Sequence, residues 1–198
     1  MAFDQLLLLA AIQGITEFIP VSSSGHLVLA HEWGGMVHAD ALSSAVQDVA
    51  LHLGTLVAVM VYFRQDFARL AMGAWDLLQA KQTEPRQEAL NMGYATVPVS
   101  LAAALLVGLG LVDALRTPEI VAWASILFAV PLYLADRYGA SAKSVSDMAA
   151  RPALLMGLAQ MLALIPGASR AGVTIMAGRA LGFSREAAAR YSMCMAMP

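Results

Sequence analysis

The run from Met92 to Val112 constrains the fold most, because it contains no charged residue. A transmembrane helix needs about 20 such residues to cross roughly 30 Å of hydrocarbon. A second uncharged run, Ile120 to Ala135, lies between Glu119 and Asp136. Of the 198 residues, 59% are hydrophobic and only 13% are charged, whereas soluble domains are about one quarter charged. We therefore expect an all-α polytopic membrane protein.

The basic residues between the apolar segments predict how the chain is oriented. A third apolar segment, Val49 to Phe63, is followed by an expected loop over 64–91 with four basic residues. The expected loop over 136–151 carries three, and the short 113–119 loop carries only Arg116. Because cytoplasmic loops are enriched in Lys and Arg, the first and third loops are expected in the cytoplasm. The net charge of −2 and the lack of a basic tail offer no electrostatic case for nucleic-acid binding.

Two polar motifs interrupt apolar segments and resemble each other. "IPVSSSGH" covers Ile19–His26 and "IPGASRAG" covers Ile165–Gly172. At an offset of 146 positions the Ile-Pro pairs match, and Ser23 falls on Ser169. A duplicated unit separated by an odd number of spans is inverted in the membrane. The sequence thus predicts one membrane domain, 1–198, with inverted repeats at about 1–112 and 113–198, each carrying a re-entrant helix pair.

Each motif has the residues of a broken helix that can bind an anion. Proline ends the incoming helix, and serine or threonine caps the outgoing one. The unpaired N–H groups at a helix N-terminus attract anions, phosphate among them. The alternative is a simple kink whose serines bond to freed carbonyls inside a bundle.

Arg170 is the most telling charged residue, because an arginine within a membrane segment is costly and marks function by default. Its planar guanidinium suits phosphate or carboxylate. The alternative is an ion pair with Glu17, which would also be compatible with an empty site. Gln13 lies four residues before Glu17, so both are expected on one side of the first helix.

Two hydroxyl residues have spacings that fit a catalytic site. His26 lies three residues after Ser23, one helical turn away, as a nucleophile and its base would. Thr174 lies four residues after Arg170 and either adds a hydroxyl to the same face or serves packing. These patterns predict a phosphate-binding site toward the outer face, but they leave hydrolysis and transport both open.

The two motifs together resemble the signatures of bacterial undecaprenyl-diphosphate phosphatases, the bacitracin-resistance family. "QGITEFIPVSSSGH" is similar to the family's (E/Q)xxxE and PVSS(S/T)GH pattern, and "PGASRAGVT" to its PGxSRSxxT pattern. "DVALHLGTLVAV" resembles the segment between them, so the likeness covers essentially the whole chain.

The resemblance implies a multi-pass enzyme of the bacterial inner membrane with its active site toward the periplasm. Such an enzyme removes the terminal phosphate of undecaprenyl diphosphate, a prenyl lipid, and so recycles the lipid carrier of cell-wall synthesis. The implied fold is a helical bundle of inverted repeats with re-entrant helices, and dimers are common in the family. The implied cofactor is a divalent cation, Mg²⁺ or Ca²⁺.

Carried over residue by residue, the resemblance assigns catalysis to Glu17, Ser23, His26 and Arg170, and metal binding to Gln13 and Glu17. The substrate-binding residues that it implies are Ser22, Ser24, Gly25, Gly167, Ser169 and Thr174.

The sequence departs from the family pattern in a few places. Gln13 is allowed by the pattern but removes one possible metal-binding carboxylate. Ala171 stands where a serine is usual, and His52 where a glutamine is common. Family chains continue for several helices beyond Pro198, so we expect a C-terminally truncated chain with an incomplete second repeat. The remaining alternative function is a transporter or flippase for a phosphorylated lipid or another anion.

Overall fold

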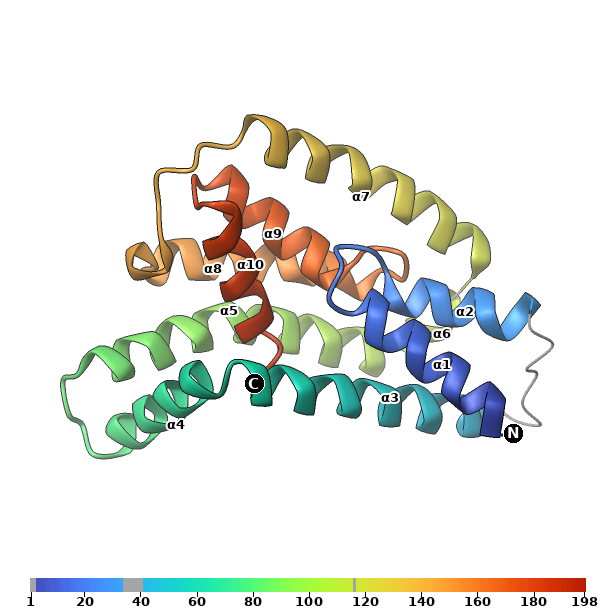
Figure 1. The fold of residues 1–198 in the computed structure, drawn as a ribbon, viewed down its shortest axis with the longest axis horizontal. Coiled ribbons are helices and arrows are strands. Elements are labelled where there is room, and N and C mark those ends of the chain that lie inside the picture. Colours follow the sequence, from blue (N-terminus) through green and yellow to red (C-terminus); the bar gives the residue numbers. More distant parts are fainter. Residues whose placement is uncertain (1–2, 34–40, 116) are drawn as a thin grey trace.

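The computed structural model describes residues 3–33, 41–115 and 117–198, and Figure 1 shows their path. In these ranges the regular elements are helices, joined by turns and by one isolated β-bridge between Lys143 and Phe183. The predicted all-α fold is confirmed. Arg116, which entered the orientation argument, lies outside the described residues.

Two long helices correspond to the two uncharged runs. Helix α5 covers Glu84–Gly108 and α7 covers Pro118–Tyr138, and both are long and apolar enough to cross a membrane. Helix α5 begins before the apolar run because the Thr83 side chain accepts a hydrogen bond from the Arg86 N–H. It ends before Val112 because Gly110 adopts a φ of 66°, which interrupts a right-handed helix.

The expected loop over 64–91 is wrong, because most of it is helical. Helix α3 covers Ala41–Tyr62, and α4 covers Arg64–Leu78 after a bend of 91°. Charged residues of α4 face those of α5, as in the pair of Arg69 and Glu88. Counting α3 and α4 as one bent span raises the number of candidate spans in the described residues from 2 to 3.

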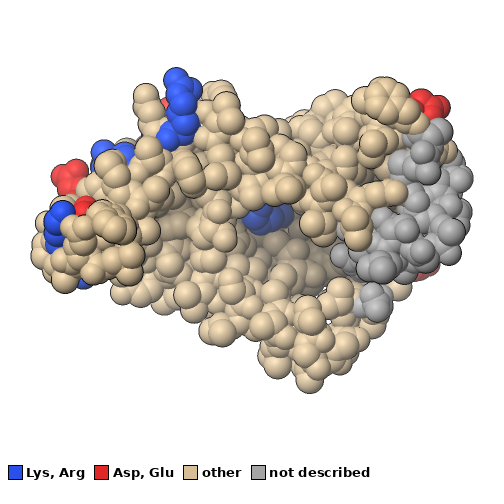
Figure 2. Space-filling model, turned by 90° about the horizontal axis from the view of Figure 1, so that it is seen from below, with Lys and Arg blue, Asp and Glu red and all other residues tan. Residues whose placement is uncertain are grey.

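Apolar side chains remain exposed along one side of several helices. On α3 they recur every four residues, at Val49, Leu53, Val57 and Val61, each more than half exposed. Such stripes are costly in water and suit hydrocarbon. Figure 2 shows a face of the molecule with few charged residues, which gather in its left third and at its right tip, apart from one basic patch in a central hollow. The structure thus agrees with the predicted membrane protein.

Two helix–break–helix units lie next to each other. The first contains α1 (Phe3–Thr16) and α2 (Ser23–Trp33). The second contains α8 (Ala150–Gln160), the short 3₁₀ helix η2 (Met161–Leu164) and α9 (Arg170–Ala180). Figure 1 shows the turn between α1 and α2 beside the turn before α9. The remaining elements are α6 (Val112–Leu115), η1 (Val145–Asp147) and α10 (Arg185–Cys194). That the two halves are inverted repeats stays a prediction.

The best-packed core lies where α8 crosses α5. Ala95 of α5 and Ala153 and Met156 of α8 are fully buried there. Gly157 allows this close approach, since a Cβ at that position would lie 2.4 Å from the Ala95 carbonyl oxygen.

A buried arginine fixes the far end of α9. Arg179 is 2% exposed and donates hydrogen bonds to the backbone carbonyls of Asp136, Gly139, Ala140 and Phe183. These carbonyls belong to the end of α7, the residues that follow it and the turn before α10. Because α9 is held at this end, its N-terminal Arg170 has a defined position.

We expect Gly157→Ala to destabilise the protein by about 1–3 kcal/mol, because the added methyl group overlaps the α5 backbone. Thermal unfolding in detergent measures the effect. Gly93→Ala in α5 is the matched control, since a Cβ there meets nothing within 4 Å. Equal melting temperatures for the two variants would contradict the proposed close contact.

Candidate active site

The helices α2 and α9 begin with the same local structure. The Ser22 hydroxyl accepts a hydrogen bond from the Gly25 N–H at 3.1 Å, and the Ser169 hydroxyl accepts one from the Gly172 N–H at 3.1 Å. The next backbone bonds also match, from His26 to the Ser22 carbonyl and from Val173 to the Ser169 carbonyl. Both breaks are therefore N-capped helix starts, as the sequence predicted.

This geometry corrects the predicted correspondence between the two motifs. The counterpart of Ser169 is Ser22, not Ser23, and Ser23 corresponds to Arg170. The offset after the turn is one larger than the offset of the Ile-Pro pairs, because the second turn has an additional residue. Gly167 in that turn adopts a φ of 97°, which a residue with a side chain rarely adopts.

Glu17 and Arg170 form the charged centre of the site. Arg170 Nη2 donates to Glu17 Oε1 at 2.9 Å, and the side chains are only 22% and 15% exposed. The Ser23 hydroxyl donates to Glu17 Oε2 at 2.8 Å. The ion pair that the sequence left open is thus formed, and it joins the two motifs.

A contact from α10 fixes the other side of Arg170. Arg170 Nη1 donates to the Ser192 carbonyl at 3.0 Å. The Ser192 hydroxyl lies 2.6 Å from that of Thr174, which in turn donates to the Arg170 carbonyl. Thr174 is fully buried and does not line the cavity, and its predicted contact with substrate stays a prediction. Sequence reasoning missed Ser192, whose only signal is a hydroxyl within the segment "YSMCMA".

Two further residues approach Glu17 from other helices. Gln13 Nε2 donates to Glu17 Oε2 at 3.1 Å and to the Thr55 hydroxyl at 3.4 Å. His52 Nε2 lies 3.9 Å from Glu17 Oε2. His52 Nδ1 lies 2.7 Å from the Asp48 carbonyl, and because a carbonyl only accepts, that nitrogen carries a proton. The sequence had left His52 without a role.

A cavity of about 180 Å³ opens beside the ion pair. Its polar walls come from both motifs and from α3, namely Glu17, Ser22, Ser23, Ser24, His52, Ser169 and Arg170. A more apolar cavity of about 690 Å³ adjoins it and shares Glu17, Ser24, His52 and Arg170. That second cavity runs along α3 past Leu53, Leu56 and Val59.

His26 does not lie with the charged centre. Its Nδ1 bonds to the Ser22 carbonyl at 2.7 Å, and its side chain lines another cavity, of about 470 Å³, with Gly167 and Ser169. Ser23 bonds to Glu17 instead. The predicted Ser23–His26 pair is therefore not formed, because consecutive turns of α2 direct the two side chains into different cavities. A catalytic role for His26 stays a prediction.

The sequence matches the family model described as "Bacitracin resistance protein BacA" over residues 6–198. This chain belongs to the BacA family. It is 47% identical over 198 residues to a Maricaulis maris protein named undecaprenyl-diphosphatase, which covers all of this chain and 72% of the relative. Proteins with the same name from Roseobacter denitrificans and Nitrosococcus oceani are 44% and 43% identical. Each match again covers all of this chain and 73% of the relative.

The helix caps lead to a first test of the site. We expect Ser22→Ala and Ser169→Ala each to lower the free energy of unfolding by about 1 kcal/mol, because each removes an N-cap bond. Ser24→Ala is the control, since the exposed Ser24 hydroxyl accepts no such N–H bond. Chemical denaturation in detergent compares the three. A loss for Ser24→Ala as large as for Ser22→Ala would contradict the cap assignment.

The ion pair leads to a second test. We expect Glu17→Gln and Arg170→Gln each to cost about 1–3 kcal/mol of stability, below the roughly 3–5 kcal/mol of a fully buried pair. The double variant should lose less than the two single losses together, because neither charge is left unpaired. The exposed pair Arg69–Glu88 provides the comparison cycle, with a coupling of only about 0.2–1 kcal/mol. A coupling energy between Glu17 and Arg170 no larger than that between Arg69 and Glu88 would contradict a stronger interaction in the buried pair.

Proposed function

We propose that this chain hydrolyses undecaprenyl diphosphate to undecaprenyl phosphate and inorganic phosphate. Membership of the BacA family and the shared name of its relatives support this function. The observation that carries it is the ion pair of Arg170 and Glu17, set between two capped helix starts. Recycling of the lipid carrier for cell-wall synthesis, and with it resistance to bacitracin, would follow from this reaction.

The diphosphate would bind where the N-termini of α2 and α9 meet. N–H groups in the first turn of a helix carry partial positive charge and favour phosphate. Arg170 adds a full charge, and its planar guanidinium matches two phosphate oxygens. When phosphate enters, it would replace Glu17 as the partner of Arg170 Nη2, so the ion pair keeps the guanidinium in place until substrate arrives.

The prenyl chain of the bound substrate would extend from the site along α3. The adjoining cavity of about 690 Å³ connects the charged centre with Leu53, Leu56 and Val59. The exposed apolar stripe of α3 lies beyond it, where membrane lipid is expected. A lipid with a diphosphate head and an apolar tail therefore suits the two connected cavities better than a soluble diphosphate.

For the chemical step we propose Ser23 as nucleophile and Glu17 as its base. The Ser23 oxygen attacks the terminal phosphorus in line while its proton passes to Glu17, with which it already shares a hydrogen bond of 2.8 Å. The bond from this phosphorus to the bridging oxygen breaks, and undecaprenyl phosphate leaves with the proton from Glu17. Water then hydrolyses the phosphoserine, which releases inorganic phosphate and restores the serine hydroxyl. Arg170 stabilises the charge on the transferred group.

We also propose that a divalent cation, Mg²⁺ or Ca²⁺, binds at Glu17 and Gln13. The buried amide oxygen of Gln13 has no hydrogen-bond partner among the described residues, which fits a donor for a cation. The described part of the chain has no group of three or more His, Cys, Asp or Glu side chains that could hold a metal. The substrate would have to supply oxygen ligands, as is usual for Mg²⁺ at phosphate sites. Such an ion would neutralise charge on the diphosphate.

The orientation in the membrane is part of the proposal. The distribution of Lys and Arg favours the α4–α5 turn and the segment after α7 in the cytoplasm. The candidate site would then face the periplasm, in the inner membrane of a bacterium. A homodimer stays an expectation from the family resemblance.

Phosphate release from a C55 or shorter prenyl diphosphate in detergent tests the function. We expect turnover that EDTA suppresses and that Arg170→Ala lowers by about 10²–10³-fold or more, since it removes the main charge on the transferred group. Arg151→Ala, an exposed arginine outside the three cavities, should keep full activity. Substrate binding without release in the wild-type protein would contradict hydrolysis and favour a transporter or flippase.

The same assay separates the adjacent serines. Ser23→Ala should lower turnover by about 10³-fold or more, whereas Ser24→Ala should lower it less than about 10-fold, because only Ser23 bonds to Glu17. Near-full activity of Ser23→Ala would eliminate the nucleophile role and leave Ser23 as a phosphate ligand.

A further inference from the structure

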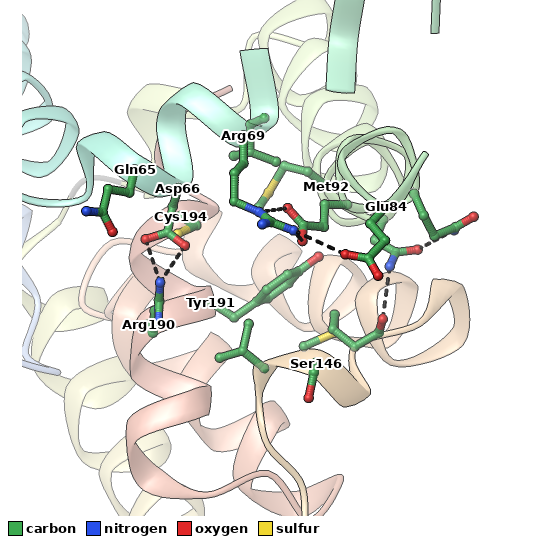
Figure 3. Close-up of a pocket in the computed structure, with 15 residues that line it drawn as sticks. Gln65, Asp66, Arg69, Glu84, Met92, Ser146, Arg190, Tyr191 and Cys194 are labelled. Carbon is green, nitrogen blue, oxygen red and sulfur yellow. Dashed lines mark hydrogen bonds and ion pairs between the residues drawn. The ribbon is translucent and has the colours of Figure 1, made fainter. Parts of the chain in front are cut away.

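A separate cavity lies on the α4–α5 side of the bundle. It measures about 590 Å³, and Figure 3 shows its walls, which come from α4, α5, the segment around η1 and α10. It shares no lining residue with the 180 Å³ cavity of the candidate active site. Its volume lies within the roughly 300–1,000 Å³ of typical ligand sites.

Charged groups of both signs surround this cavity. Arg190 of α10 donates to both carboxylate oxygens of Asp66 in α4, at 2.8 and 3.0 Å. Arg69 of α4 donates to both carboxylate oxygens of Glu88 in α5, from Nη2 at 2.6 Å and from Nε at 3.0 Å. The Glu84 carboxylate lies 3.8 Å from Arg69 Nη2. The lining thus contains three carboxylates and two guanidinium groups.

One polar group inside the cavity has no partner. Tyr191 is only 6% exposed, and its hydroxyl is buried without a hydrogen bond to any described residue. Figure 3 shows its ring reaching from α10 toward the space between Arg69, Glu84 and Ser146. A buried hydroxyl without a partner is unfavourable, so this group indicates a ligand that supplies one.

The lining excludes several classes of ligand. A metal ion is disfavoured because Asp66 and Glu88 are bound to arginines and no cluster of metal-binding side chains forms in the described residues. A simple anion is disfavoured because carboxylates outnumber guanidinium groups. A purely apolar molecule would desolvate the charged groups without replacing their bonds. A ligand with an ammonium group next to a phosphate can satisfy both kinds of charge.

The position of the cavity suggests where such a ligand comes from. Its α5 wall consists of Glu84, Gln87, Glu88, Asn91 and Met92, which form one face of the first turns of that helix. The uncharged run of α5 begins at Met92, so these turns lie at the level where lipid headgroups meet the hydrocarbon. An aminophospholipid can reach this depth directly from the bilayer.

We propose that this cavity binds the phosphoethanolamine headgroup of a membrane lipid. The phosphate accepts hydrogen bonds from Arg190, Arg69 and the Tyr191 hydroxyl, and the ammonium donates to the carboxylates of Glu84 and Glu88. Arg190 bonds to Asp66 through Nη2 alone, so its other two nitrogens can serve the phosphate. This site is independent of the proposed hydrolysis, although Tyr191 directly precedes Ser192, whose carbonyl holds Arg170.

Native mass spectrometry of the purified protein in mixed micelles tests the proposal. With phosphatidylethanolamine and phosphatidylglycerol of equal chain length, we expect at least five-fold preferential retention of the former. Tyr191→Phe should reduce this preference at least three-fold and leave the melting temperature of the lipid-free protein unchanged, because no protein hydrogen bond is lost. Tyr94→Phe, at a half-exposed tyrosine of α5 outside the cavity, is the matched control and should keep the preference.

Calorimetry with soluble O-phosphoethanolamine distinguishes the source of the ligand. Binding that Tyr191→Phe weakens, together with retention of the lipid, supports a headgroup site. Binding of O-phosphoethanolamine without retention of the lipid would support recognition of the phosphoethanolamine group. It would overturn the membrane lipid as the source of that group. Equal retention of both lipids with no binding of O-phosphoethanolamine would overturn the proposal, as would an unchanged preference in Tyr191→Phe.

Discussion

The ion pair between Glu17 and Arg170 is the interaction on which the arrangement of this site depends. Two opposite charges within an apolar bundle are tolerated only when hydrogen bonds replace their lost hydration. Ser23 and Gln13 satisfy the carboxylate, and the Ser192 carbonyl satisfies the second guanidinium nitrogen. These partners come from α1, α2 and α10, and Arg170 itself belongs to α9. The same bonds that make the pair tolerable therefore also fix both helix breaks against each other.

The broken helices create the site because the backbone N–H and C=O groups freed at each break need hydrogen-bond partners. Within a membrane bundle, free N–H and C=O groups are tolerated only where side chains, other helices or a polar cavity satisfy them. Ser22 and Ser169 satisfy one N–H each, and the residues that follow them, Ser23 and Arg170, line the polar cavity. A fold that only needed to cross the membrane would have no reason to carry two such breaks. Here both helix starts and the arginine line the same small cavity.

The sequence predicted those features whose signal is local. Uncharged runs predicted α5 and α7, and the Ile-Pro and serine residues predicted both helix breaks. The sequence predicts a loop where α4 lies, because the charges of this segment, such as Arg69, pair with α5 only in the folded protein. The bond of Ser23 to Glu17 rather than to His26 depends on the direction in which α2 leaves its turn. Ser192 and His52 reach Glu17 and Arg170 from distant segments, and spacing along the chain cannot reveal such contacts.

The shift of the motif alignment by one residue has a consequence for how two similar motifs build one site. Ser23 and Arg170 occupy the same structural position, the first residue after a capping serine. Both side chains turn toward one carboxylate, Glu17, one from each motif. Equivalent positions of the two motifs thus carry different chemistry, a hydroxyl in one and a guanidinium in the other. The site is therefore asymmetric because different side chains occupy equivalent positions, and no additional structural element is needed.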